Sequence, residues 1–196
     1  MLRISKIALV SMSIAIYSAP AFAHPGHGID NTVVQGFLHP VSGVDHALAM
    51  LSVGFLAFRL GGRALWAIPA AFIIMMAAGG VLGATGIEIP TIEQVIATSG
   101  LVLGVLMALA ARLSLPFVIP VTALFAMFHG VAHGTEGAVG SALPLSYFSG
   151  FLLATAVLLG AGIVLGHGVS VLQKRDLLQR IAGAAVGLTG FLMLVG

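Results

Sequence analysis

The sequence predicts an all-α integral membrane protein in which six transmembrane helices follow a cleaved signal peptide. Three observations predict this fold. Of the 196 residues, 59% are hydrophobic and only 7% are charged, whereas a soluble domain carries roughly 25% charged residues. The hydrophobic residues gather in stretches of about 20, the length at which a helix crosses a bilayer. The few basic residues fall between alternate stretches, as in the cytoplasmic loops of multi-pass proteins.

Residues 1–23 are predicted to be a secretory signal peptide. They begin with the basic residues Arg3 and Lys6, continue with a short apolar core and end in the small-residue pattern Ala-Phe-Ala. This order is typical of a signal peptide, and we expect cleavage after Ala23. The alternative is an uncleaved first helix, which the apolar core disfavours because it has only about half of the roughly 20 residues that a span needs.

Residues 24–31 are predicted to form a short periplasmic arm that carries His24 and His27. After cleavage, the free amine of the new N-terminus would lie beside the imidazole of His24, a pair that can chelate a borderline divalent cation. Our hypothesis is that this arm captures metal outside the membrane, and the alternative is an unstructured polar stub.

Residues 32–196 are predicted to form one six-helix transmembrane domain. No linker or low-complexity segment divides it. Gly, Pro or charged residues separate the apolar stretches, and each stretch is close to the length of a spanning helix. The stretches cover residues 41–59, 64–83, 93–111, 115–133, 145–166 and 177–195.

Charges between the stretches predict the orientation of the chain. The basic residues after the signal peptide all lie in loops that one side of the membrane would share, namely Arg59, Arg63, Arg112, Lys174, Arg175 and Arg180. The opposite loops carry Glu88, Glu93 and Glu136. Because cytoplasmic loops collect Lys and Arg, we expect a protein of the bacterial cytoplasmic (inner) membrane with both mature termini in the periplasm.

Two further patterns concern how the predicted helices pack. Three spans per half would invert the second half relative to the first, the 3+3 arrangement common among secondary transporters. The halves show no convincing sequence match, so this arrangement is a hypothesis. Glycines recur at four-residue spacing, as in Gly79 and Gly83 or Gly162 and Gly166, which indicates close approach of helix backbones.

Two clusters of ionisable residues interrupt the apolar stretches. The first span carries His39, Asp45 and His46, and the fourth carries His129, His133 and Glu136. At about 1.5 Å per helical residue from the basic ends of these spans, both clusters fall in the outer half of the membrane. Ionisable groups at that depth cost a few kcal/mol each unless they are paired, hydrated or bound to metal. A single histidine there is ordinarily interfacial, but two clusters at the same face predict a functional site.

The spacing within each cluster suits a metal site. His129 and His133 are four residues apart and share a helical face, as two ligands of one ion must. Pro40 and Gly43 lie between His39 and His46, and a helix broken there would fold His39 back toward His46. Asp45 and His46 are adjacent, so one of them would bind an ion while the other orients a ligand or faces another helix.

Other candidate ligands carry less weight. The chain has no cysteine, so a metal would be held by imidazole, carboxylate, thioether or backbone oxygen. We expect Met50, one turn below His46, to be a packing residue and His167 to be an ordinary interfacial histidine. Gly130 and Gly134 follow the two histidines of the fourth span and would let either an ion or a neighbouring helix approach the backbone.

The segments HPVSGVDH (residues 39–46) and FHGVAHGTE (residues 128–136) together resemble the HupE/UreJ family of membrane nickel permeases. The resemblance implies secondary transport of Ni²⁺ into the cell to supply hydrogenase or urease. It also implies a metal site at the residues matching the family's motifs, which are His39, Asp45, His46, His129, His133 and Glu136. The first segment is similar to the His-x4-Asp-His motif of the separate nickel/cobalt transporter family, but five residues separate His39 from Asp45 here.

Several alternatives stay open at this point. Imidazole with carboxylate suits Ni²⁺, Co²⁺, Cu²⁺ and Zn²⁺ alike, so cobalt or another divalent cation is an alternative cargo. A zinc-dependent membrane hydrolase is a second class, and haem held between His46 and His129 is a third. The expected partners are a divalent metal ion and the lipid bilayer, without nucleic acid or a tightly bound cofactor. No Gly-x4-Gly-Lys-Ser/Thr loop for ATP is present.

Overall fold

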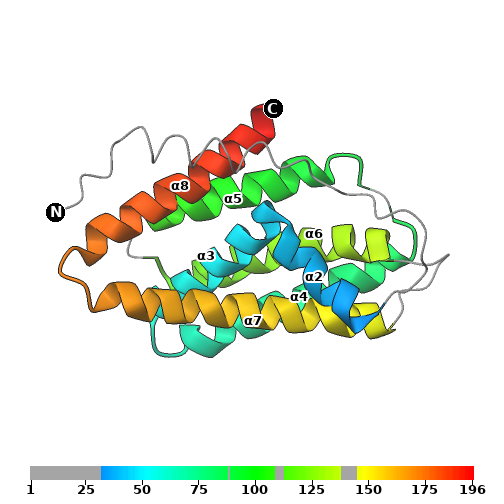
Figure 1. Cartoon of the computed structure of the whole chain (residues 1–196), viewed down its shortest axis with the longest axis horizontal. Coiled ribbons are helices and arrows are strands. Elements are labelled where there is room, and N and C mark those ends of the chain that lie inside the picture. The colour runs from blue at the N-terminus through cyan, green and yellow to red at the C-terminus, as the bar shows by residue number, and fades with distance from the viewer. Residues whose placement is uncertain (1–31, 88, 109–112, 138–144) are drawn as a thin grey trace. The chain divides into compact units, whose positions relative to one another are not determined.

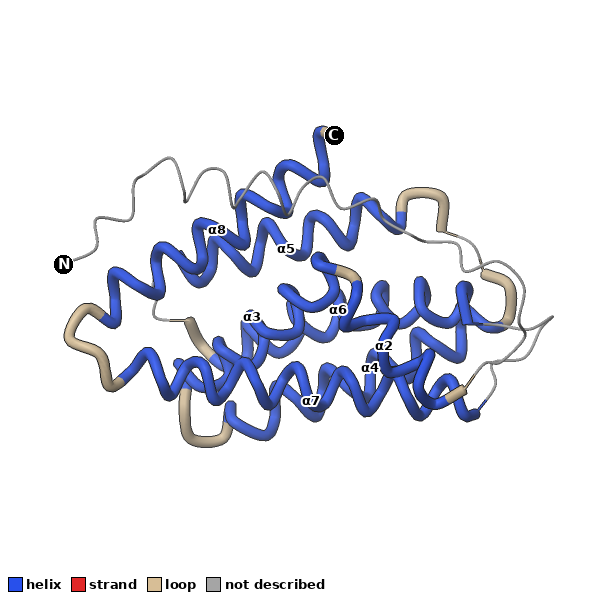
Figure 2. The backbone as a smooth tube through the Cα atoms, viewed as in Figure 1, coloured by secondary structure: helices blue, strands red, loops and turns tan. Residues whose placement is uncertain are grey.

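Helices and their connections make up all of the chain that the structure, a computed structural model, describes: residues 32–87, 89–108, 113–137 and 145–196 (Figures 1 and 2). The predicted signal peptide, the arm with His24 and His27, Glu88 and Arg112 lie outside these residues. The helices are α2 (Val33–Ser42), α3 (Val44–Leu60), α4 (Ala64–Ala84), α5 (Ile92–Ala108), α6 (Leu115–Gly137), α7 (Leu145–Ser170) and α8 (Arg175–Val195).

The first predicted span is a broken helix. It begins at Val33 rather than near residue 41, because Thr32 and Gln35 form a capping box in which each side chain bonds the other residue's backbone N–H. Pro40 has no N–H to continue the helical ladder, and the backbone becomes extended at Gly43 (φ −78°, ψ 111°). The chain then restarts as α3, bent by 84° relative to α2. The predicted break between His39 and His46 is therefore confirmed.

Four of the helices, α4, α6, α7 and α8, are long and apolar enough to cross a membrane, and the bent pair α2–α3 would make a fifth span. Helix α5 is apolar but only 17 residues long. The structure thus supports four or five of the six predicted spans. Helix α6 ends at Gly137, later than the predicted end at residue 133, so Glu136 continues the helical face of His129 and His133.

The helices pack in three main pairs, α4 with α6, α5 with α8, and the α2–α3 pair with α7. Glycines make these contacts close. A Cβ atom on Gly79 would collide with the Met127 carbonyl, and one on Gly104 would collide with Gly187. The predicted tight packing at spaced glycines is confirmed. Gly130 and Gly134 belong to the same class, because each faces the backbone of α4.

The direction of each pair follows from its contacts. In α4 and α6 the contacts rise together, from Met76 against Gly130 to Gly80 against Gly134, so these two helices are parallel. Helices α3 and α7 are parallel for the same reason. In α5 and α8 the contacts run in opposite senses, with Gly100 facing Gly190 and Ala108 facing Gly183. These two parallel pairs and one antiparallel pair are the directions expected if each long element of the chain runs opposite to the one before it.

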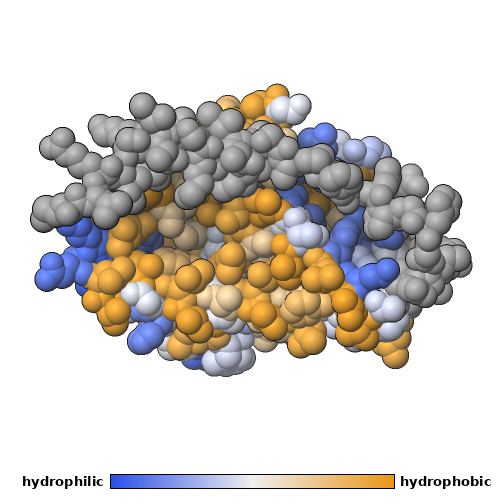
Figure 3. Space-filling view, viewed as in Figure 1, coloured by the Kyte–Doolittle hydropathy of each residue, from blue (hydrophilic) through white to orange (hydrophobic). Residues whose placement is uncertain are grey.

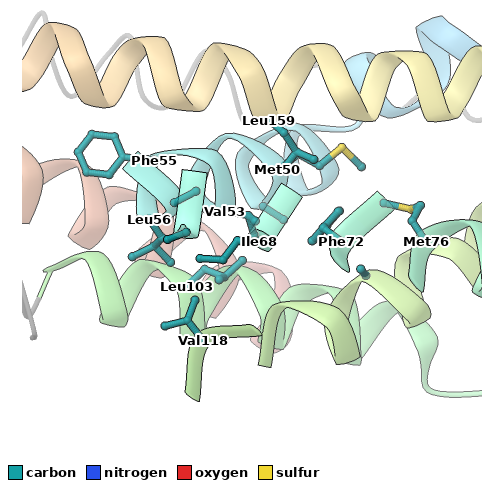
Figure 4. Close-up of a cluster of buried hydrophobic side chains, with 14 of the residues drawn as sticks. Met50, Val53, Phe55, Leu56, Ile68, Phe72, Met76, Leu103, Val118 and Leu159 are labelled. Carbon is teal, nitrogen blue, oxygen red and sulfur yellow. The ribbon is translucent and has the colours of Figure 1, made fainter. Parts of the chain in front are cut away.

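A hydrophobic core joins α3, α4, α5, α6 and α7 (Figure 4). Met50, Phe72 and Phe151 are fully buried in it, so Met50 is a packing residue as predicted. Outward-facing residues are also apolar. Leu153, Val157 and Val164 on α7 are between 50% and 69% exposed, and in Figure 3 hydrophobic residues cover the middle of the visible face while hydrophilic residues lie toward its ends. Such a surface suits lipid rather than water.

A cavity of about 370 Å³ lies where α3 and α5 end and α4, α6 and α8 begin. Arg59 and Arg63 line it, together with Gln179, whose buried amide donates a hydrogen bond to the Met107 carbonyl. Arg59 also lies 3.8 Å from Asp176 at the start of α8. The predicted loop that carries Arg59 and Arg63 therefore meets the start of α8, which Lys174 precedes, at one end of the helices.

Candidate metal site

The two ionisable clusters found in the sequence meet in the structure. The imidazole ring of His133 lies 4.9 Å from that of His39 and 4.5 Å from that of His46, between ring centroids. The ring of His46 lies 5.0 Å from that of His129. Four histidines from α2, α3 and α6 thus form one group, although about 80 residues of sequence separate the first pair from the second.

Helix α6 supplies three of the predicted site residues from one face. His129, His133 and Glu136 follow one another at intervals of four and three residues, which places them along one side of a helix. His129 and His133 are fully buried, whereas the side chain of Glu136 is half exposed. The face therefore runs from the protein interior to the surface within about two helical turns.

The bend between α2 and α3 brings His39 onto this face. Its Nε2 atom lies 2.5 Å from a carboxylate oxygen of Glu136. One ligand atom from each of His39, His133 and Glu136 lies within 4.8 Å of the others. Two ligands at 2.0–2.2 Å from one ion are at most about 4.4 Å apart, so small side-chain rotations would close these three around a cation.

Hydrogen bonds fix the tautomers of the two inner histidines. The Nδ1 atom of His129 lies 2.9 Å from the Phe125 carbonyl oxygen, which only accepts, so Nδ1 carries the hydrogen and Nε2 keeps a lone pair. The Nδ1 atom of His46 lies 2.9 Å from a carboxylate oxygen of Asp45, which also accepts the His46 backbone N–H. Asp45 therefore orients His46, one of the two roles that the sequence left open, as carboxylates orient metal-ligating histidines.

Several buried nitrogens of the group have no hydrogen-bond partner among the described residues. They are Nε2 of His46, Nε2 of His129 and both ring nitrogens of His133. Most buried polar atoms in proteins are paired, and an unpaired one costs about 1–3 kcal/mol. In neutral rings three of these four nitrogens carry lone pairs and the fourth is an N–H of His133. A cation bound here would satisfy lone pairs that no described residue satisfies.

Aromatic residues of α7 form a wall that sequence reasoning missed. The ring of Phe151 stacks on that of His133 with centroids 5.4 Å apart, and the ring of Tyr147 lies 6.2 Å from that of His39. Gly36 on α2 faces the Tyr147 backbone closely enough to exclude a side chain. Nothing in the sequence separates these aromatics from others in the apolar stretches, so only the fold could reveal them.

The remaining histidine of the described chain is remote from this group. His167 lies near the end of α7, where its ring is 5.8 Å from that of Phe58 on α3. Because Phe58 precedes Arg59, this contact belongs to the end of the helices that carries the basic residues. His167 is thus no part of the histidine group.

Comparisons with known proteins agree with these motifs. The family model described as "HupE / UreJ protein" matches residues 12–193. The curated "Protein HupE" of Rhizobium leguminosarum bv. viciae is 42% identical over 198 residues, and the alignment covers all of both chains. No solved structure matches the chain significantly. With its long apolar helices and this match along nearly its whole length, the chain is a multi-pass membrane protein that belongs to the HupE/UreJ family.

Proposed function

We propose that this protein is a secondary transporter, a permease that imports Ni²⁺ across the cytoplasmic membrane and supplies it for hydrogenase or urease. The observation that carries the proposal is the convergence of four imidazoles and the Glu136 carboxylate from two distant segments, together with the buried ring nitrogens of this group that no described residue pairs. Imidazole is a preferred ligand of late divalent metals. Ionisable side chains inside a membrane are costly and ordinarily mark a functional site, so these histidines are better explained by metal binding than by packing.

The burial of the site supports transport over a closed structural metal centre. His39 and Glu136 are partly exposed and reachable from one side, while His129 and His133 are fully buried. Toward the other end, Met50 and Val53 on α3 and Val118 on α6 are fully buried in the hydrophobic core (Figure 4). Along α3, Met50 and Val53 lie between His46 and Arg59, which lines the cavity. A site accessible from one side and closed toward the other is what one state of an alternating-access carrier requires.

Helix pairing supports the inverted 3+3 arrangement within this proposal. Counting α2–α3 as the first element and α4 to α8 as the second to sixth, the main pairs are first with fifth, second with fourth, and third with sixth. If the first, second and third elements are matched to the fourth, fifth and sixth, the first–fifth pair corresponds to the fourth–second pair. The third–sixth pair then corresponds to itself. The parallel and antiparallel directions are also preserved under this matching, as they would be for two related halves.

The orientation of the proposal follows from charge. Arg59 and Arg63 lie at the end opposite Glu136, and cytoplasmic ends collect basic residues. Ni²⁺ would therefore load from the periplasmic side through Glu136 and His39, with both mature termini in the periplasm. Cobalt is an alternative cargo of the same site, because the ligand set alone does not separate the two metals.

Uptake of Ni²⁺ by cells that lack other nickel importers tests the proposal. Expression of the protein should raise accumulation of Ni²⁺ from submicromolar medium, and excess Co²⁺ or Zn²⁺ would rank the competing cargoes. His129→Ala should abolish the gain at equal protein level, while His167→Ala, remote from the site, should keep it. An unchanged uptake in His129→Ala would refute the assignment of the site.

A second candidate function rests on the donor set of His39, His133 and Glu136. Two histidines and one glutamate also hold catalytic zinc in hydrolases, with a water as the fourth ligand. A zinc-dependent membrane hydrolase would retain stoichiometric zinc after purification and would hydrolyse a lipid amide or ester. A purified protein that is active in uptake but free of zinc would exclude this candidate.

A further inference from the structure

The cavity at the basic end of the helices has the features of a ligand site separate from the histidine group. Its volume of about 370 Å³ lies within the range of small-molecule sites, about 300–1,000 Å³. Arg59, at the end of α3, and Arg63, just before α4, both line it. The buried Gln179 lines it from α8, and its amide nitrogen has a second N–H beyond the one that bonds the Met107 carbonyl.

The described residues leave this cavity with an excess of positive charge. Arg59 lies 3.8 Å from the exposed carboxylate of Asp176, whereas Arg63 forms no salt bridge within the described part of the chain. Ala64 and Leu115, the first residues of α4 and α6, also line the cavity, and the positive end of a helix dipole favours an anion. Because α3 and α5 end beside the same cavity, the two arginines rather than the dipoles decide its sign. The ligand that suits it is an anion.

The remaining wall of the cavity is apolar, which narrows the class of anion. Five leucines line it beside the arginines, namely Leu56, Leu60, Leu106, Leu113 and Leu115. A guanidinium group matches the geometry of a phosphate with two parallel hydrogen bonds. A free phosphate ion would gain nothing from the leucines, whereas a phospholipid carries apolar chains next to its phosphate. A phospholipid therefore uses both parts of the wall.

Trp66 indicates that this end of the helices lies at the level of the lipid headgroups. It is the only tryptophan of the chain, it follows the start of α4 by two residues, and it is 61% exposed. Tryptophan is enriched at the interface between membrane and water. The cavity, which the first residue of α4 lines, is thus at a depth that phosphate groups of lipids can reach.

We propose that this cavity binds the headgroup of one anionic phospholipid, whose phosphate is held by Arg59 and Arg63 and whose chains begin against the leucines. Basic pockets between transmembrane helices are known to recognise anionic headgroups. A zwitterionic phosphatidylcholine suits the cavity less well, because its quaternary ammonium group would lie near the two guanidinium groups. Binding of the lipid does not depend on transport. Only its assignment to the cytoplasmic leaflet rests on the orientation proposed above.

Native mass spectrometry of the purified, delipidated full-length protein in detergent tests this inference. Given equal concentrations of phosphatidylglycerol and phosphatidylcholine, the wild type should preferentially retain one molecule of phosphatidylglycerol per chain. In Arg59→Gln/Arg63→Gln the affinity for phosphatidylglycerol should fall about 25-fold, since each basic residue contributes about fivefold to attraction of anionic lipid. Both arginines are exposed, so the variant should fold, and the comparison of the two lipids on the wild type needs no variant.

Arg175→Gln/Arg180→Gln is the charge-matched control. Both residues are exposed on α8 at the same end of the helices, but neither lines the cavity. This variant should therefore lose much less affinity for phosphatidylglycerol than Arg59→Gln/Arg63→Gln. Excess inorganic phosphate should leave the bound lipid in place, because it cannot replace the contacts of the lipid chains with the leucines.

Three results would overturn the proposal. Equal retention of the two lipids by the wild type would show that the cavity does not select an anionic headgroup. Equal losses in the two double variants would show that the lipid responds to net charge and not to the cavity. Displacement of the lipid by inorganic phosphate would identify a site for free anions instead. Failure of the transport proposal would appear in Ni²⁺ uptake and would leave lipid retention in detergent unchanged.

Discussion

Asp45 gives the sharpest prediction, because one of its oxygen atoms accepts both the backbone N–H and the ring Nδ1–H of His46 at 2.9 Å. Asp45→Asn keeps an oxygen that can accept both bonds but removes the charge, and Asp45→Ala removes the acceptor as well. Loss of a carboxylate that orients a metal-ligating histidine costs about 10–100-fold in metal affinity.

We assign the lower end of this range to Asp45→Asn and the upper end to Asp45→Ala, which correspond to about 1.4 and 2.7 kcal/mol. The reason is that the alanine variant also frees the His46 ring to rotate and to change tautomer. Asp45 lies in the first turn of α3, so both changes should also weaken the helix slightly, by about 0.3–1 kcal/mol.

The assay is Ni²⁺ binding to purified protein in lipid nanodiscs, measured by isothermal titration calorimetry. Asp176→Asn is the matched control. Asp176 is also an aspartate in the first turn of its helix, but it lies beside Arg59 at the end of the helices remote from the histidines. Equal affinities of Asp45→Ala and the wild type, within twofold, would refute the assignment of Asp45 as the residue that orients His46.

Three further predictions follow from packing and ligand binding. Gly130→Val should destabilise the protein by about 1–3 kcal/mol, because its Cβ would collide with the Met76 carbonyl. Gly160→Ala, whose Cβ would meet nothing within 4 Å, should not destabilise it, because alanine is favoured over glycine inside a helix by about 0.5–1 kcal/mol. Thermal unfolding in detergent measures both. Ni²⁺ at 100 times its dissociation constant should stabilise the wild type by about 2.7 kcal/mol. At the same Ni²⁺ concentration it should stabilise a His39→Ala/His133→Ala double variant, which lacks two of the three grouped ligands, much less in the same melts. Gly43→Leu should impair Ni²⁺ uptake more than stability, because its Cβ alone would lie 3.2 Å from both Asp45 Oδ1 and His46 Nδ1. Normal uptake by this variant would show that space beside these two atoms is not required for the site.

Sequence reasoning reached the local features of the site because they depend on neighbouring residues. The broken first span follows from the intrinsic chemistry of Pro40 and Gly43, and the shared face of His129 and His133 follows from helical periodicity. That the two clusters meet could be anticipated because counting along each span from its basic end gives similar depths for both.

Other features depend on contacts between distant segments and could not be read from the sequence. One local feature was missed as well: the capping box of Thr32 and Gln35 starts α2 at Val33, but it is polar and falls outside the apolar window. The wall made by Tyr147 and Phe151 depends on how α7 packs against α2, which local sequence does not encode. The difference between His133 and its neighbours arises from hydrogen bonds that only the folded chain reveals.

Transport by purified protein in liposomes tests the central claim most directly. Vesicles containing the wild type and an internal Ni²⁺-sensitive dye should fill with Ni²⁺ when it is added outside. Vesicles containing equal amounts of folded His46→Ala or His129→Ala should fill no faster than protein-free vesicles. Rapid filling with both variants, or none with the wild type under any imposed ion gradient, would contradict the account.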